Sequence, residues 1–254
     1  MLLDGAFGSL VVNGDPNFYK NNTNLSVFLF KHLNKDKAIH ESYAIAGSDI
    51  LSAHTFSIHP KVPAYKVMLK ALVASAREVA DRYDKKVALS VGPIQEGTIE
   101  DYSKVIEPVA QEVDYILLET FTSLSELEIA VTSALMFDRP IISQMCFGKY
   151  FSIAGDSLYD YVEEIEPLVD YIGFNCVSPY DLDELIPQMV ELVDSDKICV
   201  QPNVGEPTIN ETSIYYEPLD HNKLASLLKK YNIGMVGLCC GSTPVDIQML
   251  KVLL

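Results

Sequence analysis

Short runs of apolar residues, many of them β-branched, alternate along the chain with longer stretches in which apolar residues recur every three or four positions. The short runs are typical of buried strands, and the longer stretches are typical of amphipathic helices. The alternation repeats about eight times. The predicted strands are residues 2–4, 50–53, 87–91, 115–119, 141–144, 171–175, 198–201 and 235–238.

The helices expected between these strands are residues 63–83, 123–137, 158–169, 182–193, 219–231 and 245–254. In the first of them, Leu69, Leu72 and Val73 recur at the spacing of one helical face. The second begins with Ser123, three residues before Glu126, which is typical of a capping box.

Eight strand–helix units predict a closed parallel barrel of the (β/α)8 TIM type, in the α/β class. The length of 254 residues suits a single barrel domain covering residues 1–254. An open doubly wound sheet has the same alternation, but such sheets often carry a Gly-rich phosphate turn after the first strand, which this sequence lacks. The first crossover is the irregular part, because residues 21–24 are rich in asparagine.

Composition and charge narrow the possible functions. Hydrophobic residues make up 48% of the chain and charged residues 21%, which is typical of a folded protein with a large core. The formal net charge of −16 would repel nucleic acids and anionic membranes. The apolar stretches fall far short of the ~20 residues that cross a bilayer, and the N-terminus lacks a basic segment followed by an apolar run. We therefore expect a cytoplasmic protein that binds neither nucleic acid nor membranes.

The five cysteines are the candidate chemistry. Catalytic residues of such a barrel lie just beyond the carboxyl ends of its strands, where Cys176 and the Cys239–Cys240 pair stand. Three converging sulfurs suit Zn²⁺, with a fourth position open for substrate. The alternative is that these cysteines are small core residues. We favour that alternative for Cys146 and Cys199, and we discount a Cys239–Cys240 disulfide because it would close a strained ring.

Four segments resemble the homocysteine S-methyltransferase family. They are Leu-Asp-Gly-Ala-Phe-Gly at 3–8, Ala-Gly-Ser-Asp-Ile-Leu-Ser-Ala-His-Thr-Phe at 46–56, Gly-Phe-Asn-Cys at 173–176 and Val-Gly-Leu-Cys-Cys-Gly-Ser-Thr-Pro at 236–244. The motifs are most similar to those of the homocysteine module of cobalamin-dependent methionine synthase. The resemblance implies a (β/α)8 barrel that methylates homocysteine to methionine, with zinc held by Cys176, Cys239 and Cys240.

The resemblance also implies roles for three further residues. Asp4 and Glu119 stand where acidic residues of the family hold the amino group of the substrate, through charge-assisted hydrogen bonds. The alternative for both is a helix cap or a solvated loop. Asn203 lies in a Pro-Asn-Val-Gly segment and would occupy the open zinc position until homocysteine arrives, or would simply form a turn. His54 stands where the family usually has Asn, and its role is left open.

The methyl donor is the least constrained part of the prediction. Residues 148–155 resemble a loop of the cobalamin-dependent module, and the chain is short for the family, so we expect a methylcorrinoid carried by another protein or domain. The alternatives are S-methylmethionine, S-adenosylmethionine and betaine, although the chain has no tryptophan for an aromatic cage. A zinc- or thiol-binding protein without turnover, and methyl transfer to a different thiol, also remain open.

Overall fold

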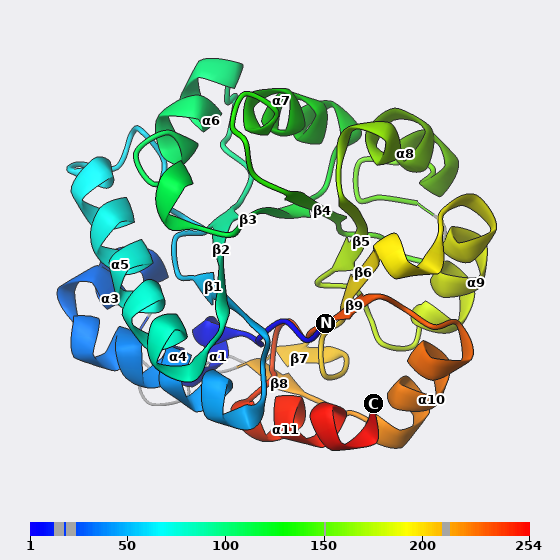
Figure 1. The fold of residues 1–254 in the computed structure, drawn as a ribbon. Coiled ribbons are helices and arrows are strands. Elements are labelled where there is room, and N and C mark those ends of the chain that lie inside the picture. The colour runs from blue at the N-terminus through cyan, green and yellow to red at the C-terminus, as the bar shows by residue number, and fades with distance from the viewer. Residues whose placement is uncertain (13–17, 19–23, 150, 210–213) are drawn as a thin grey trace.

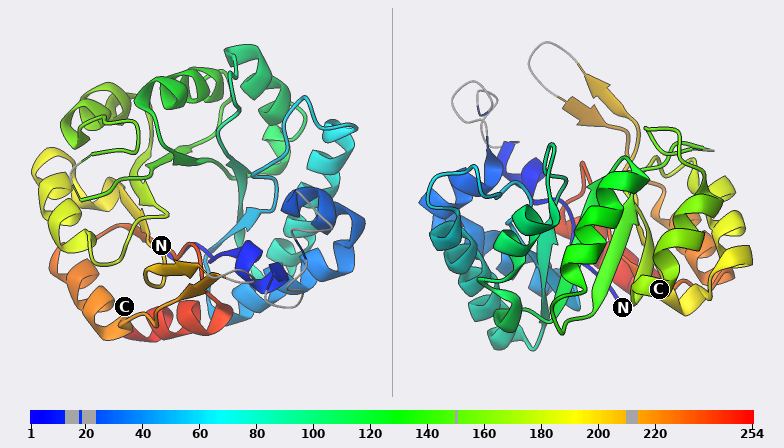
Figure 2. Two further views of the ribbon diagram at one scale, coloured as in Figure 1. Left: turned by 180° about the vertical axis from the view of Figure 1, so that it is seen from behind. Right: turned by 90° about the horizontal axis from the view of Figure 1, so that it is seen from above.

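The computed structural model describes residues 1–12, 18, 24–149, 151–209 and 214–254. Seven parallel strands form one curled sheet in the order β1-β2-β3-β4-β5-β6-β9 (Figure 1). These strands are β1 (Ile50–Ala53), β2 (Lys86–Val91), β3 (Tyr115–Phe121), β4 (Ile141–Met145), β5 (Tyr171–Asn175), β6 (Ile198–Gln201) and β9 (Met235–Val236). Two further strands, β7 (Pro207–Ile209) and β8 (Ile214–Tyr216), pair antiparallel as a separate hairpin, which projects from one end of the sheet (Figure 2).

Helices form an outer layer around the curled sheet (Figure 1). They are α1 (Phe7–Val12), α3 (Leu25–Lys31), α4 (Leu33–Ala46), α5 (Tyr65–Tyr83), α6 (Ile99–Ile106), α7 (Leu124–Ala134), α8 (Leu158–Ile165), α9 (Leu182–Leu192), α10 (His221–Lys230) and α11 (Pro244–Leu253), with short 3₁₀ turns η1 (Ala110–Glu112), η2 (Glu166–Leu168) and η3 (Ser195–Lys197). None of the helices in the described part of the chain is long and apolar enough to cross a membrane.

The strand expected at residues 2–4 is reduced to two single bridges, in which Leu2 pairs with Val236 of β9 and Leu3 pairs with Ile50 of β1. Carboxylates interrupt the ladder on the β1 side. Asp49 accepts the N–H of Leu2 at 2.8 Å, and Asp4 accepts the N–H of Ser52 at 2.7 Å. These side chains take hydrogen bonds that a strand ladder would use, so residues 2–4 do not form a regular strand. The structure therefore shows a curled sheet of seven strands, and the predicted closed barrel of eight strands is not shown.

The core has two parts, one on each face of the sheet. Seven buried residues share the inner face, namely Leu3, Ile50, Ala88, Leu117, Ile142, Cys199 and Met235. A larger cluster fills the space between the outer face and the helices. This two-sided burial explains why the strands read as continuous apolar runs rather than as alternating patterns. The inner cluster also closes the interior below the carboxyl ends of the strands, so that the polar residues gather above it.

The structure agrees with seven of the eight predicted strands within one or two residues, and the six predicted helices are present as helices or as a helix with a 3₁₀ turn. It also contains elements that the sequence did not predict: α1, α3, α4, α6 and the β7–β8 hairpin. Ser123 is the N-cap residue of α7, but its side chain makes no capping hydrogen bond. Most of the asparagine-rich stretch lies outside the described residues.

Candidate active site

Three cysteines meet at the carboxyl end of the sheet. Cys176 follows β5, and Cys239 and Cys240 come three and four residues after β9. The loop after β6 fixes their backbones: the N–H of Cys176 donates to the Gln201 carbonyl at 3.1 Å, and the N–H of Cys239 donates to the Pro202 carbonyl at 2.7 Å. Cys176 has a φ of 52°, a left-handed conformation that is uncommon for a residue with a side chain. Such backbone strain is found most often at functional sites.

The three sulfurs are in two different states. Cys176 and Cys239 form a disulfide, whereas the Cys240 Sγ lies 3.8 Å from that of Cys176 and 3.9 Å from that of Cys239. The assignment of these three cysteines as metal ligands stays a prediction. The shared anchoring on the β6 loop brings the Cα atoms of Cys176 and Cys239 to 5.5 Å, within the range that a disulfide can bridge. The adjacent pair, Cys239 and Cys240, is not bonded.

This donor set fits zinc. Two sulfur ligands of a tetrahedral Zn²⁺ at ~2.3 Å each lie about 3.8 Å apart, close to both distances measured from Cys240. All three sulfurs lie within 4.8 Å of one another. Reduction of the disulfide would therefore supply three thiolates converging on one point. Three protein ligands leave the fourth tetrahedral position for a substrate, as in catalytic zinc sites.

Two acidic residues lie beside the sulfurs, and each is held by hydroxyl groups from a neighbouring strand. Asp4 is 2% exposed and accepts hydrogen bonds from the backbone N–H and the hydroxyl of Ser52, at 2.7 and 2.8 Å. Glu119 accepts a short hydrogen bond from the Ser90 hydroxyl and a longer one, 3.4 Å, from the amide of Asn175. Both carboxylates are therefore fixed in place before any ligand arrives.

The electrostatics of these groups link them into one site. Burial raises the pKa of Asp4 to about 6, although the Ser52 hydrogen bonds and the charge of His54 oppose this shift. Burial also raises the pKa of Glu119 to about 7, against the Ser90 hydrogen bond and with help from the charge of Asp4. The pKa of Cys240 is raised by burial and by the charge of Glu119. A cation placed here would relieve the repulsion between the carboxylates.

Several amide oxygens near the cysteines have no partner in the described structure. They are the side-chain oxygens of Asn203, Gln201 and Gln144, all of them buried. Asn203 lies in the loop after β6, and the N–H of the next residue, Val204, donates to the Cys240 carbonyl at 3.1 Å. A buried acceptor without a partner costs about 1–3 kcal/mol. The unpaired side-chain oxygen of Asn203 is therefore available to a ligand.

Sequence reasoning did not single out the residues that hold the carboxylates. Ser52 and Ser90 each interrupt an apolar strand close to its carboxyl end, and this pattern was the available signal. Asn175 lies within a quoted motif but was given no role, and it also accepts the N–H of Thr120 at 2.8 Å. Reasoning from the sequence also missed the partner of His54, Asp36 of α4, because α4 itself was not predicted.

The two remaining cysteines lie apart from the three-sulfur group. Cys199 belongs to the inner core cluster, and its sulfur accepts a hydrogen bond from the Gln144 amide at 3.0 Å. Cys146 is also buried, with its sulfur 4.0 Å from the Asn175 side-chain oxygen. Burial, with the charges of Cys240 and Glu119, raises the pKa of Cys146 to about 12. This thiol therefore stays protonated near the site.

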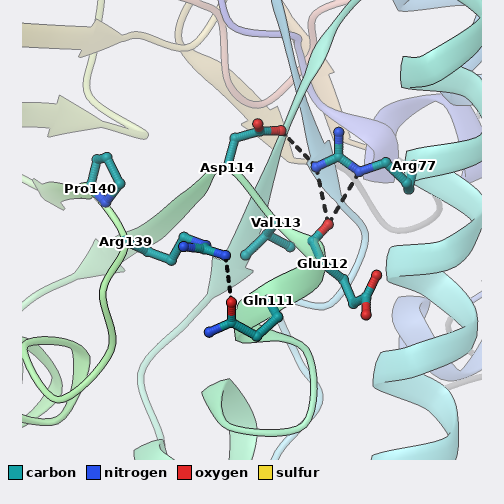
Figure 3. A pocket seen from close by; sticks show the side chains of 7 residues that line it. All are labelled: Arg77, Gln111, Glu112, Val113, Asp114, Arg139 and Pro140. Atoms are coloured by element: carbon teal, nitrogen blue, oxygen red, sulfur yellow. Dashed lines mark hydrogen bonds and ion pairs between the residues drawn. The ribbon is translucent and has the colours of Figure 1, made fainter.

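A separate polar cleft of about 390 Å³ opens at the amino ends of β3 and β4, opposite the cysteines (Figure 3). Its lining residues are Arg77, Gln111, Glu112, Val113, Asp114, Arg139 and Pro140. Arg77 donates to the Glu112 carbonyl and the Asp114 carboxylate, and Arg139 donates to the Gln111 side chain (Figure 3). The guanidinium groups thus link neighbouring loops. In barrel-like folds the face at the amino ends of the strands contributes to stability rather than to catalysis.

Fold and site together define an α/β protein whose parallel sheet carries a cluster of cysteine sulfurs and carboxyl groups at its carboxyl end. The family model for homocysteine S-methyltransferase matches residues 1–254, and the chain belongs to this family. The family predicted from the sequence is therefore confirmed, and the class of enzyme that this family represents is a methyltransferase.

Individual relatives are distant. The chain is 26% identical over 250 residues to the methionine synthase of Mycobacterium tuberculosis, covering 84% of this chain and 21% of that protein. Homocysteine S-methyltransferase 2 of Saccharomyces cerevisiae is 23% identical over 154 residues, covering 54% of this chain and 46% of that protein. The chain therefore spans about a fifth of the length of the methionine synthase and about half that of the yeast protein.

Among solved structures, the homocysteine methyltransferase MmuM from Escherichia coli has a similar fold. Its oxidized form superposes with a TM-score of 0.82 at 20% identity, and its metallated form with a TM-score of 0.81 at 18% identity. Each match covers 99% of this chain and 95% of the MmuM chain. At these identities the likeness shows the fold.

Proposed function

We propose that this protein transfers a methyl group to homocysteine and so forms methionine, with zinc held by Cys176, Cys239 and Cys240. The observation that carries the proposal is the pair of carboxyl groups, Asp4 and Glu119, fixed beside three converging sulfurs. Homocysteine has one thiol for a metal and one ammonium group for the carboxylates. Its thiol and its ammonium group therefore match the two halves of the site.

Each half of the site has a separate task. Bound zinc would keep the substrate thiol deprotonated at neutral pH, where a free thiol with a pKa near 8.5 is mostly protonated. Asp4 and Glu119 receive the ammonium group, whose charge favours the ionised form of both carboxylates. Ser52, Ser90 and Asn175 keep those carboxylates in position.

Asn203 would complete the metal site in the absence of substrate. Its buried side-chain oxygen has no partner in the described structure. The next residue, Val204, donates its N–H to the Cys240 carbonyl. Oxygen is an acceptable ligand for Zn²⁺, although a weaker one than sulfur. Homocysteine would displace it by offering a thiolate.

The methyl donor that we propose is a methylcorrinoid carried by another protein or domain. Support comes from the relative named methionine synthase, of which this chain spans 21%. Around the mouth, Phe151, Ile153 and Tyr215 are 57%, 76% and 60% exposed, so apolar surface is available to a bulky donor. A zinc- or thiol-binding protein without turnover is less favoured, because it would have no use for two fixed carboxyl groups.

The test is zinc content combined with methionine formation. Reduced, zinc-loaded protein would be supplied with homocysteine and with methylcobalamin, S-methylmethionine, S-adenosylmethionine or betaine in parallel. We expect one zinc per chain and methionine from methylcobalamin. Cys239→Ala should lose zinc and reduce methionine formation at least 100-fold, because two sulfurs remain.

Cys146→Ser is the matched control for that experiment. It also removes a buried thiol near the site, but from outside the three-sulfur group, so zinc content and turnover should stay within about threefold of wild type. Turnover only with a small donor would refute the corrinoid proposal. Absence of zinc from the reduced wild type, or equal zinc loss in both variants, would refute the metal site.

A further inference from the structure

One aspartate and two histidines form a buried group between α4 and the end of β1. Asp36 and His40 stand four residues apart in α4, so they share one face of this helix. His54 follows β1 directly, and its Nδ1 lies 2.7 Å from the Oδ1 of Asp36. Asp36 and His40 are fully buried, and His54 is 1% exposed. None of the three belongs to the proposed zinc or substrate ligands.

Polar atoms without a partner are concentrated in this group. Among the described residues, seven buried side-chain nitrogen or oxygen atoms have no hydrogen-bond partner. Four of them are the Oδ2 of Asp36, both ring nitrogens of His40 and the Oγ of Ser75 in α5, which lies beside Asp36. Buried polar atoms are paired in the great majority of cases, because leaving them unpaired is destabilising. Four such atoms around one carboxylate therefore point to a ligand that they share.

The spacing of the three side chains suits a single metal ion. Nitrogen and oxygen ligands that lie about 2.0–2.2 Å from a tetrahedral ion are roughly 3.3–3.6 Å apart. The Nδ1 of His54 lies 2.7 Å from the Oδ1 of Asp36, and the Nε2 of His40 lies 3.6 Å from its Oδ2. One ligand atom from each residue lies within 4.8 Å of the other two. Two imidazoles and a carboxylate are a donor set of divalent first-row transition ions.

Two of the ligands are already in the protonation state that a metal requires. Burial acts to raise the pKa of Asp36, but the charge and hydrogen bond of His54, the charge of His40 and the nearby Ser75 hydroxyl outweigh burial and hold that pKa below its usual value. Burial, together with the charge of His54, lowers the pKa of His40 to about 3. At neutral pH the group therefore offers an ionised carboxylate and a neutral imidazole, the forms that bind metal ions.

The two imidazole rings must change their relative orientation to share an ion. They stack at a centroid distance of 4.0 Å with an angle of 11° between their planes. A metal ion lies near the plane of each imidazole that binds it, so it cannot bind two parallel, stacked rings. His54 is held by Asp36, whereas both nitrogens of His40 are without a hydrogen bond. His40 is therefore the ring that turns about its Cβ–Cγ bond, and this turn costs it no hydrogen bond.

We propose that Asp36, His40 and His54 bind a divalent first-row transition metal ion at a second site, separate from the cysteines. Because all three residues are buried, the ion is structural and joins α4 to the end of β1. His54 comes two residues after Ser52, which holds Asp4, so the ion also steadies the strand end beside that carboxylate. The family resemblance suggests asparagine at position 54, so the third ligand distinguishes this chain.

Metal content distinguishes this site from the cysteine site. Reduced protein would be unfolded in urea and refolded with one equivalent of Zn²⁺, which thiolates prefer, and with Co²⁺ present, so that an ion can enter before the buried site closes. After removal of free metal, wild type should hold one zinc and one cobalt per chain. Its absorption spectrum should lack a thiolate-to-cobalt charge-transfer band. Cys239→Ala should still retain one ion per chain.

His40→Phe removes one ligand and keeps a flat ring against His54. It should hold zinc alone, and Co²⁺ should raise the midpoint of urea unfolding of wild type but not of this variant. His32→Gln is the matched control, because His32 is an exposed histidine at the N-cap of α4, and it should hold both ions. As much cobalt in His40→Phe as in wild type would overturn the proposal.

A measurement on the wild type does not depend on a folded variant. With ¹⁵N-labelled histidine, bound Co²⁺ should strongly shift or broaden the resonances of His40 and His54 and change that of His32 little, because paramagnetic effects fall steeply with distance. Cobalt that acts on other histidines, or that gives a thiolate band, would place the ion elsewhere and refute the proposal. Wild type that retains zinc but no cobalt would also refute it, and would leave the proposed cysteine site intact.

Discussion

Glu119 is held in the folded protein in an environment that opposes its charge. Its pKa rises from a usual 4.5 to about 7, mainly through burial. A carboxyl group with a raised pKa binds more protons in the folded state than in the unfolded state between these two values. The free energy of unfolding should therefore fall as the pH rises from about 4.5 to 7, and then level off. At 1.36 kcal/mol per pH unit, the cost above pH 7 is about 3 kcal/mol.

Replacing Glu119 with Gln should remove this cost. Glu119→Gln keeps an acceptor for the Ser90 hydroxyl, so urea unfolding of the ligand-free protein at pH 8 should show about 2–3 kcal/mol more stability than wild type. At pH 4.5 the two proteins should differ by less than about 1 kcal/mol. The exposed Glu164→Gln serves as control and should change stability little at either pH. A Glu119→Gln gain that is the same at both pH values would contradict the ionisation argument.

The cysteines were the part of the candidate site that the sequence made easiest to propose. Cysteine is rare, and Cys176, Cys239 and Cys240 follow strands that could be located from their apolar runs. The supporting residues were harder to find. Serine at positions 52 and 90 is common in any strand, and only the paired geometry of neighbouring strands shows that each hydroxyl meets a carboxylate.

At the scale of elements, the loop after β9 depends on a single glycine. Gly241 has a φ of 84°, and a Cβ there would lie 2.6 Å from atoms of Tyr216 and Val204. Its N–H donates to the Ser9 hydroxyl at 2.9 Å, so the peptide that follows Cys240 is fixed. The conformation and the close approach both exclude a side chain. The position of the Cys240 sulfur therefore depends on this glycine.

Gly241→Ala should displace Cys240 and weaken zinc binding at least tenfold, because neighbouring side chains must move as well as the backbone. Gly155→Ala is the matched control: Gly155 has a φ of 99°, but a Cβ there meets nothing within 4 Å. The control should lose only the roughly 1–2 kcal/mol of left-handed strain and keep its zinc affinity. Zinc affinity would be measured by competition with a chelator. Equal zinc affinity in the two variants would show that steric contact at Gly241 is unimportant.

The elements that the sequence failed to predict were hidden for two different physical reasons. Helix α4 turns Asp36 and His40 toward the core, so polar residues stand where a helical pattern requires apolar ones. The hairpin β7–β8 has three-residue strands, too short for a periodic signal. Strands β1, β5 and β6 were located to the residue because they are largely apolar and buried. Burial of polar groups is thus what hid α4.

At the scale of the whole molecule, the N-terminal segment joins the two edges of the curled sheet. Leu2 bridges to β9 and Leu3 bridges to β1, and Leu3 is fully buried in the inner cluster with Ile50 and Met235. We infer that this segment acts as the missing eighth strand and that the chain forms one cooperative domain. If the N-terminal segment only lay on the surface of the seven-stranded sheet, residue 3 would not need to be buried.

Leu3→Ala tests this inference. Truncating a fully buried leucine costs about 2–5 kcal/mol, so the midpoint of urea unfolding should move to a clearly lower concentration. If the chain is one domain, far-ultraviolet circular dichroism and tyrosine fluorescence should report the same single transition in wild type and variant. Val252→Ala, at a residue 80% exposed, should change stability by less than about 0.5 kcal/mol. The inference would be wrong if Leu3→Ala were as stable as Val252→Ala, or if the two probes gave separate midpoints. The first residues would then lie against the sheet without completing it. In that case β5, β6 and β9 alone would hold the cysteine loops.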